Sequence, residues 1–233
     1  MSQINFTLFD SGQLNSAGVS SFNTNSKTWA SGHVYFMAIG QYEEADTVPT
    51  PTPTASGWTL VGTISAASYK AITILYKVGD GSTSAASVSF GSELQSDIFW
   101  AIADGGANTV NTTTTYISSN VKTATGGDIT PTVTMDSLAD ATNNAILFAF
   151  EGNYSATATP ESGWTNLYST ENQQPSSFGG LGWRLGGSDL TPGYTTATNG
   201  WRAIGVEVAA APMAILTSVK LGPGVLMNWG TIQ

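Results

Sequence analysis

A short motif occurs twice in this chain, and its spacing constrains the fold more than any other feature. Residues 53–59 read PTASGWT and residues 160–165 read PESGWT, so Gly57 and Gly163 lie 106 positions apart. Similarity at a fixed spacing indicates a supersecondary unit that is used more than once. The residues around each copy therefore indicate whether a longer unit is repeated.

The flanks of the two motifs also correspond. An apolar run precedes each motif, an aromatic-basic-aliphatic-glycine string follows it, and a further apolar strand closes the unit. These landmarks are residues 33–39, 76–79 and 99–103 in the first half and 145–150, 183–186 and 201–206 in the second. We interpret the order as an internal duplication; the alternative is that similar strand and turn patterns arose independently.

The local pattern predicts strands almost throughout. Apolar and polar residues alternate in segments such as 73–78, and glycine, proline or Asp80-Gly81 separate the segments. The expected strands are 3–9, 33–42, 58–64, 71–78 and 97–103 in the first half, and 131–135, 144–153, 163–168, 178–185 and 200–208 in the second. We expect an all-β, two-sheet sandwich of jelly-roll type in which each half contributes strands to both sheets. Two small separate sandwiches are the alternative.

The repeat also sets the expected domain boundaries. Residues 1–211 form the duplicated sandwich, with halves of about 1–105 and 128–211, and residues 212–233 form an apolar C-terminal extension. The stretch from Gly105 to Asp128 is polar and bounded by glycine. It is expected to connect the halves with at most one strand, extended at a sheet edge, because threonine fits a pleated surface.

Charge and composition exclude several partners. The chain carries 7 basic and 16 acidic residues, a formal net charge of −9. Nucleic-acid binders gain affinity by placing basic residues on phosphates, so nucleic acid is not an expected partner. The N-terminus has no secretory-signal pattern, and no apolar stretch has the length of a membrane span, so we expect synthesis in a cytoplasm and no membrane partner.

The sequence offers few groups for catalysis. Cysteine is absent and His33 is the only histidine, which excludes a Cys–His pair and a multi-histidine metal site. No Gly-x-Ser-x-Gly motif accompanies His33, so it is interpreted as an ordinary residue at a strand end. We predict no catalytic, cofactor-binding or metal-binding residues.

Two arrangements of acidic residues are the alternatives to that prediction. A glycoside hydrolase needs two facing carboxyl groups, and the candidates are the acidic residues that follow the two apolar runs. A calcium site needs several oxygen ligands, but the available aspartates do not match a calcium-loop motif. These residues are Glu43, Glu44, Asp46 and Glu151 for the first arrangement, and Asp80, Asp97 and Asp104 for the second.

Tryptophan and tyrosine residues divide into two expected groups. The tryptophans at repeat-equivalent or strand positions are expected to fill the core, whereas a few other aromatic residues are candidate stacking platforms for sugar. The expected core residues are Trp58, Trp100, Trp164, Trp183 and Trp201. The candidate platforms are Tyr42, Tyr154, Tyr194 and Trp229.

The repeated pattern resembles a widespread group of tailed-bacteriophage virion proteins. The resemblance rests on residues 57–61, 74–78 and 99–103 and their second-half counterparts, covering roughly residues 30–210. It implies a β-sandwich fold and a structural role as a capsid decoration, minor capsid or tail-associated subunit. The implied partners are other virion proteins and copies of the chain itself, and the implied location is the virion after synthesis in the host cytoplasm. No functional residue carries over.

The C-terminal extension contains the predicted docking residues. Residues 212–233 carry one charge, Lys220, and include the apolar run that ends in Leu226, Met227 and Trp229. This segment is expected either to complete the sandwich of its own chain or to dock on a neighbouring subunit. The competing function is a carbohydrate- or receptor-binding module of a phage tail, with a host glycan as partner.

Overall fold

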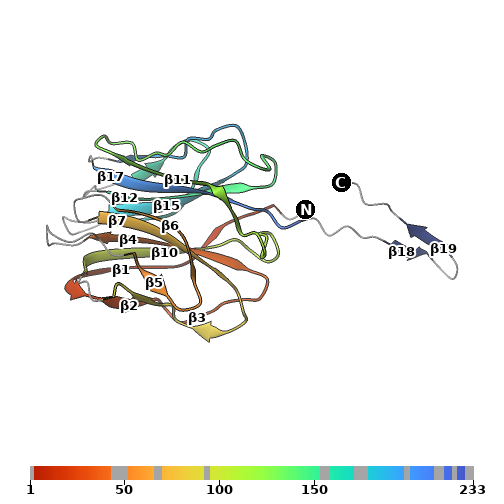
Figure 1. Ribbon diagram of the computed structural model, residues 1–233, viewed down its shortest axis with the longest axis horizontal. Helices are drawn as coiled ribbons and strands as arrows, with labels where there is room; N and C mark the ends of the chain where they lie inside the picture. Colours follow the sequence, from red (N-terminus) through yellow and green to blue (C-terminus); the bar gives the residue numbers. More distant parts are fainter. Residues whose placement is uncertain are drawn as a thin grey trace.

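The structure is a computed structural model in which every described segment is strand, turn or extended chain. The described residues are 3–42, 52–65, 70–91, 95–152, 158–170, 178–196, 200–212, 218–221 and 225–228, and they contain no helix. Two five-stranded antiparallel sheets are stacked face to face (Figure 1). The prediction of an all-β, two-sheet sandwich is therefore confirmed.

The first sheet is built from the first half of the chain. Its central strands pair without irregularity, and the edge strands β1 and β6 both contain a register shift. Across the sheet the order is β1 (Thr7–Val19), β10 (Gln95–Asp104), β4 (Val34–Tyr42), β7 (Lys70–Val78) and β6 (Thr59–Ser65).

The second sheet is built from later residues and has an equivalent strand order. Its edge strands β11 and β14 also contain register shifts, which bend an edge and hinder pairing with another chain. The order is β11 (Tyr116–Gly126), β17 (Trp201–Val208), β12 (Ala145–Gly152), β15 (Phe178–Leu185) and β14 (Thr165–Ser169).

The expected division of strands between sheets was wrong. We predicted that each half contributes to both sheets, but all strands of the first sheet lie within residues 7–104 and all strands of the second within residues 116–208. Each five-stranded sheet is completed within one stretch of the chain, although most of its paired strands, such as β1 with β10 and β11 with β17, are far apart in the sequence. Alternation shows which face of a strand is buried, but it does not show which sheet the strand joins.

Apolar residues fill the space between the sheets and also both outer faces. The inter-sheet core contains, for example, Phe36, Ile74, Phe99, Leu147 and Ile204, each at most 2% exposed. The central strands are buried on both faces, which explains why β4 and β12 read as nearly continuous apolar runs.

Short strands and loops cover the two outer faces. On the first sheet they enclose a cluster that includes Trp29, Val88 and Trp100, and on the second a cluster that includes Phe148 and Tyr194. The covering strands are β2 (Ser21–Asn23), β3 (Lys27–Thr28), β5 (Thr54–Ala55), β8 (Thr83–Ser84) and β9 (Ser87–Ser89) on the first side, and β13 (Ala158–Pro160) and β16 (Tyr194–Thr196) on the second.

Two expectations about the second half have different outcomes. Residues 131–135 are not a sheet strand: Thr132 forms an isolated bridge with Gly193, and Val133 and Met135 pack on the outer face of the second sheet. The fifth strand of that sheet is instead β11, inside the stretch expected to connect the halves. It lies at a sheet edge, as its threonine-rich sequence predicted.

The C-terminal extension contributes a hairpin of its own. Strands β18 (Ser218–Leu221) and β19 (Val225–Asn228) pair antiparallel with each other in a separate two-stranded sheet. Neither strand is hydrogen-bonded into a five-stranded sheet. An isolated two-stranded hairpin is only marginally stable in water.

Candidate functional site

Three charged side chains meet between the sheets, and we call them the inter-sheet charge cluster: Lys70, Glu151 and Arg202. Lys70 begins β7 of the first sheet, whereas Glu151 and Arg202 lie on the neighbouring strands β12 and β17 of the second. The Lys70 Nζ atom is 3.4 Å from Glu151 Oε1, and Arg202 Nη1 is 3.8 Å from Glu151 Oε2. Lys70 also donates a hydrogen bond of 3.2 Å to the carbonyl oxygen of Gly152.

The strand period places this cluster at the end of the apolar core. Side chains two residues apart lie on the same face of a strand. Lys70, Glu151 and Arg202 are each two positions from a residue of the inter-sheet core, namely Ile72, Ala149 and Ile204, so they also point between the sheets. All three are buried, and Glu151 is fully enclosed. The cluster therefore connects the two sheets through charge at the point where apolar packing stops.

The Glu151 carboxyl group is strongly perturbed by its surroundings. Burial raises its pKa to about 8, although the positive charges of Lys70 and Arg202 act in the opposite direction. Neither carboxylate oxygen accepts a hydrogen bond from a described residue. A carboxyl group with this pKa can act as an acid or base, but full burial prevents Glu151 from reaching a substrate in this conformation.

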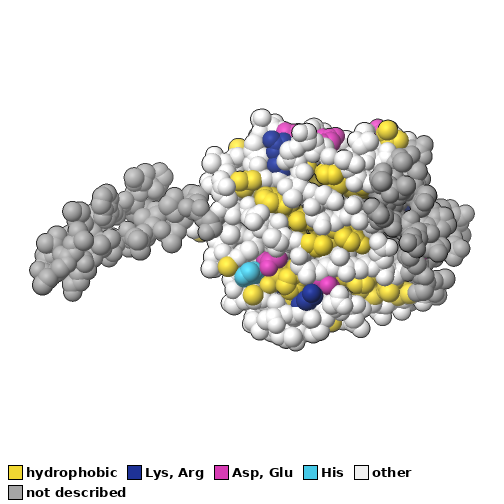
Figure 2. Space-filling view, turned by 180° about the vertical axis from the view of Figure 1, so that it is seen from behind, with side chains coloured by type: hydrophobic (Ala, Val, Ile, Leu, Met, Phe, Trp, Pro, Cys, Tyr) yellow, Lys and Arg dark blue, Asp and Glu magenta, His cyan; other side chains and the backbone are white. Residues whose placement is uncertain are grey.

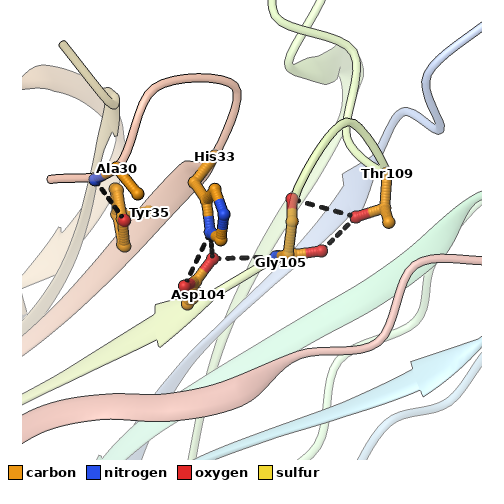
Figure 3. A network of polar contacts seen from close by, with 7 residues as sticks. Ala30, His33, Tyr35, Asp104, Gly105 and Thr109 are labelled. Carbon is orange, nitrogen blue, oxygen red and sulfur yellow. Dashed lines mark hydrogen bonds and ion pairs between the residues drawn. The ribbon is translucent and has the colours of Figure 1, made fainter. Parts of the chain in front are cut away.

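His33 forms a second polar cluster at another strand end (Figure 3). Its Nδ1 atom lies 2.9 Å from both carboxylate oxygens of Asp104, and Asp104 also accepts a hydrogen bond of 2.8 Å from the Gly106 amide. In the same network Thr109 donates to the Gly105 carbonyl. No serine is hydrogen-bonded to the imidazole among the described contacts. The hydrogen bonds of Asp104 instead connect the residue before β4 with the segment that follows β10.

Glu207 occupies the related place in the second half and is completely buried. Its carboxylate accepts hydrogen bonds from Asn120 Nδ2 at 2.8 Å, Asn144 Nδ2 at 2.6 Å and the Ala139 amide at 2.7 Å. Three donors satisfy the charge and fix the turn before β12. Like the His33 cluster, this arrangement holds chain segments together.

The acidic candidates do not converge. Glu151 faces two cations rather than a second carboxyl group, and Glu43, Glu44 and Asp46 lie outside the described residues. Asp80 pairs with Lys77 at 3.0 Å, Asp104 contacts His33, and Asp97 is buried on β10. Within the described ranges no three His, Asp or Glu side chains are grouped as a metal site would require.

Most aromatic residues belong to the cores. Trp100, Trp164, Trp183 and Trp201 are each at most 8% exposed, as predicted, and Trp58 is half-buried against Trp29. The candidate sugar platforms have mixed outcomes. Tyr194 is fully buried and donates a hydrogen bond to Asn166, so it cannot be a sugar platform. Tyr42 is half-buried, and the centroid of its ring lies 5.1 Å from the Lys70 Nζ atom. Tyr154 and Trp229 lie outside the described residues.

Large apolar side chains are scarce on the described surface. Only Leu8, Leu60 and Ile129 are strongly exposed, at 43%, 44% and 49%. On the face in Figure 2, hydrophobic side chains form short rows between polar and backbone atoms, and charged side chains are few. On this face the described residues therefore form no single large apolar patch.

The predicted docking residues fall on the C-terminal hairpin. The register pairs Leu226 with Lys220 and Met227 with Val219. Trp229 lies outside the described residues, and the docking role of all three stays a prediction.

Comparison with known proteins adds no family. No family model, no curated protein and no solved structure matches this chain. Among the described segments no helix has the length and apolarity of a membrane crossing.

The sequence analysis missed two of the three residues in the inter-sheet charge cluster. Lys70 lies just before the expected strand 71–78 and Arg202 inside the expected strand 200–208, and neither was a predicted site residue, whereas Glu151 was a candidate for a pair of facing carboxyl groups. A usable signal was present for Glu151, because it is the only charged residue of β12 and lies near the end of an apolar run. Lys70 and Glu151 are 81 positions apart in the sequence, and only the stacking of the two sheets brings them together.

Proposed function

We propose that this chain is a non-enzymatic virion structural protein, a capsid decoration, minor capsid or tail-associated subunit that acts through protein–protein contacts. The observation that carries the proposal is the use of the buried charges. Glu151 lies between Lys70 and Arg202, and Glu207 accepts three hydrogen bonds within the fold. In the described part these groups support the sandwich rather than face a site that a substrate could enter.

The proposed partners are other virion proteins and further copies of this chain. The net charge of −9 disfavours nucleic acid, and we propose no cofactor and no membrane partner. The proposed location is the virion, reached after synthesis in the host cytoplasm. Many weak contacts around a symmetric particle give strong attachment through avidity.

The C-terminal extension is the proposed attachment element, with Leu226, Met227 and Trp229 as its docking residues. Its hairpin pairs with neither five-stranded sheet, and short hairpins require further packing to be stable. A neighbouring subunit would supply that packing.

The test is deletion of residues 213–233 in the phage that encodes the chain. We expect the truncated protein to keep the tryptophan fluorescence and unfolding transition of the full chain, but to be lost from purified particles by mass spectrometry. Absence of the full-length protein from particles would overturn the proposed function. Loss of folding on truncation would show that the extension belongs to the core.

A glycan panel distinguishes the competing function. A carbohydrate-binding module would change its tryptophan fluorescence when a host polysaccharide is added to the full chain. We expect no such change from a structural subunit.

A further inference from the structure

Equivalent hydrogen bonds occur at corresponding places in the two halves. The Trp58 amide donates to the Ala55 carbonyl at 3.1 Å, and the Trp164 amide donates to the Glu161 carbonyl at 3.1 Å. The amides of Gly79 and Gly186 likewise donate to the residues that precede β4 and β12, His33 and Asn144. The register shifts of β6 and β14 also follow the repeated motif at the same offset. These contacts give a residue-by-residue correspondence between the sheets.

The packing between the sheets follows the same correspondence. Strand β7 packs on β12 and β17, and its counterpart β15 packs on β4 and β10. Strand β6 packs on β11, its counterpart β14 packs on β1, and the two central strands β4 and β12 pack on each other. Reciprocal contacts of this kind define the two-fold interface of a homodimer. Here both sides belong to one chain.

We propose that the inter-sheet interface is a two-fold docking surface that can accept the complementary half of a second copy of this chain, and that Lys70, Glu151 and Arg202 restrict it to unlike halves. The partner is thus the second sheet of another copy for the first sheet, and the reverse. The inference goes beyond the proposed function and does not depend on it.

The restriction follows from one row of residues that differs between the halves. A row here means three directly paired residues on adjacent strands. In the first sheet Gly40 pairs with Phe99 and Ile72, and at the equivalent place in the second sheet Glu151 pairs with Arg202 and Gly179. In the first row the Phe99 ring lies over Gly40, where an added Cβ would come within 1.9 Å of it. The second row places a buried ion pair in the same position.

Each row is completed by the opposite half. The Phe99 ring also fills the space above Gly179, where an added Cβ would be 2.2 Å away. Lys70 of the first half reaches Glu151 of the second at 3.4 Å. The aromatic contact and the ionic contact therefore both cross the interface between unlike halves.

Pairing of like halves would break both contacts. Two first halves would place Lys70 opposite Gly40 and Phe99, without the Glu151 carboxylate. Two second halves would leave Glu151 without the Lys70 ammonium. Either pairing of like halves would also lose the fit between Phe99 and Gly179. A buried charge that loses its partner is strongly unfavourable, so charge discriminates against the wrong pairing as repulsive elements do in other specific interfaces.

The connection between the halves allows a direct experiment. Thr112, Thr113 and Thr114 are exposed in the segment between β10 and β11, and exposed loop tips tolerate insertions. A protease site inserted between Thr112 and Thr113 lets the folded full chain be cut into its halves. Two preparations are made: one has a tag at the N-terminus of the first half, and the other has a different tag there and is isotopically labelled.

After cutting and mixing, the first tag is captured and the captured chains are identified by mass. We expect labelled second halves to be recovered with the captured first half, in at least ten-fold excess over first halves that carry the other tag. A mixture of uncut proteins is the control, because association through residues 213–233 would bring both halves together. The triple variant Lys70→Met, Glu151→Met and Arg202→Met should admit like halves and reduce the excess.

Two results would overturn the inference. In the first, the cut halves separate and do not pair again, or no labelled second half is ever captured. In the second, wild-type first halves pair with each other as readily as with second halves. The N-terminal tags lie outside the strands, and the un-nicked chain reports whether insertion alone disturbs folding.

Discussion

The two sheets share a strand order but complete their ends with different chemistry. At one matched row the first sheet places Phe99 against Gly40, and the second places Arg202 against Glu151. At the other end the first sheet has the partly exposed pair His33 and Asp104, where the second has the buried pair Asn144 and Glu207. The comparison teaches that the backbone plan tolerates exchange of apolar for charged contacts, provided that each buried charge is supplied with partners.

Removal of Lys70, the cation that the first sheet contributes to Glu151 of the second sheet, should destabilise the protein most. Lys70→Met removes one of the two cations beside the buried Glu151 carboxyl group, and above about pH 8, where that group is ionised, breaking a buried charge pair costs about 3–5 kcal/mol. We expect the free energy of unfolding, measured by urea denaturation, to fall by that amount.

The matched control is Lys122→Met. Lys122 Nζ lies 2.6 Å from Asp136 Oδ2, but the two side chains are 30% and 68% exposed. An exposed pair contributes less than about 1 kcal/mol. Equal losses at Lys70 and Lys122 would contradict a structural role for the inter-sheet charge cluster.

The next largest effect is expected at the opposite end of the second sheet. Glu207→Gln replaces one carboxylate oxygen with an amide group that donates, where three donors already point at the acid. Loss of a hydrogen bond to a buried charge costs about 1.5–3 kcal/mol, measured as the change in the urea midpoint at constant slope.

Asp104→Asn is the matched change in the first sheet. Asp104 is partly exposed, with 13% of its side chain accessible, so water can compensate for the lost interaction. A smaller loss than at Glu207 is expected. A larger loss at Asp104 would show that His33 stabilises the fold more than the Glu207 network does.

A third variant tests the apolar row of the first sheet. Gly40→Ala places a Cβ within 1.9 Å of the Phe99 ring, so the ring must move, and overpacking costs about 1–3 kcal/mol. The melting temperature should fall accordingly. Gly127→Ala is the control, because no atom lies within 4 Å of its added Cβ; a loss of stability there equal to that at Gly40 would refute the steric account.

Much of the fold could be predicted from sequence because local pattern determines strands. The runs at 33–42 and 144–153 became β4 and β12 almost residue for residue. The pattern failed where tertiary packing decides: Val133 and Met135 alternate like a strand, but they cover the second sheet instead of joining it. The jelly-roll division failed for the same reason, since face and sheet membership are separate properties.

The candidate site was less predictable than the fold. His33 was correctly placed at a strand end, and its place beside Asp104 depends on pairing between β4 and β10, 71 positions apart. The inter-sheet charge cluster depends on how two complete sheets stack. No local pattern contains that information, whereas the position of a lone charge at the end of an apolar strand indicates that a partner is needed.

The last prediction concerns pH and again separates the two rows, since only the second contains a titrating group. The pKa of Glu151 is raised from 4.5 to about 8 by burial. A raised pKa means that the folded protein holds a proton that the unfolded chain releases, so this group stabilises the fold below about pH 4.5 and the contribution is lost as the pH rises toward about 8. One unit of pKa corresponds to about 1.4 kcal/mol, and we expect the free energy of unfolding to fall by at least about that much across this window.

Glu151→Gln does not titrate, so the difference between wild type and variant should change steadily with pH in urea titrations. His33→Asn, which introduces the residue found at the matched position in the second half, is the control for the only histidine and should leave the Glu151 slope in place. A difference between wild type and Glu151→Gln that is constant from pH 4.5 to 8 would show that the carboxyl group is already ionised at the lower limit, and that Lys70 and Arg202 outweigh the effect of burial.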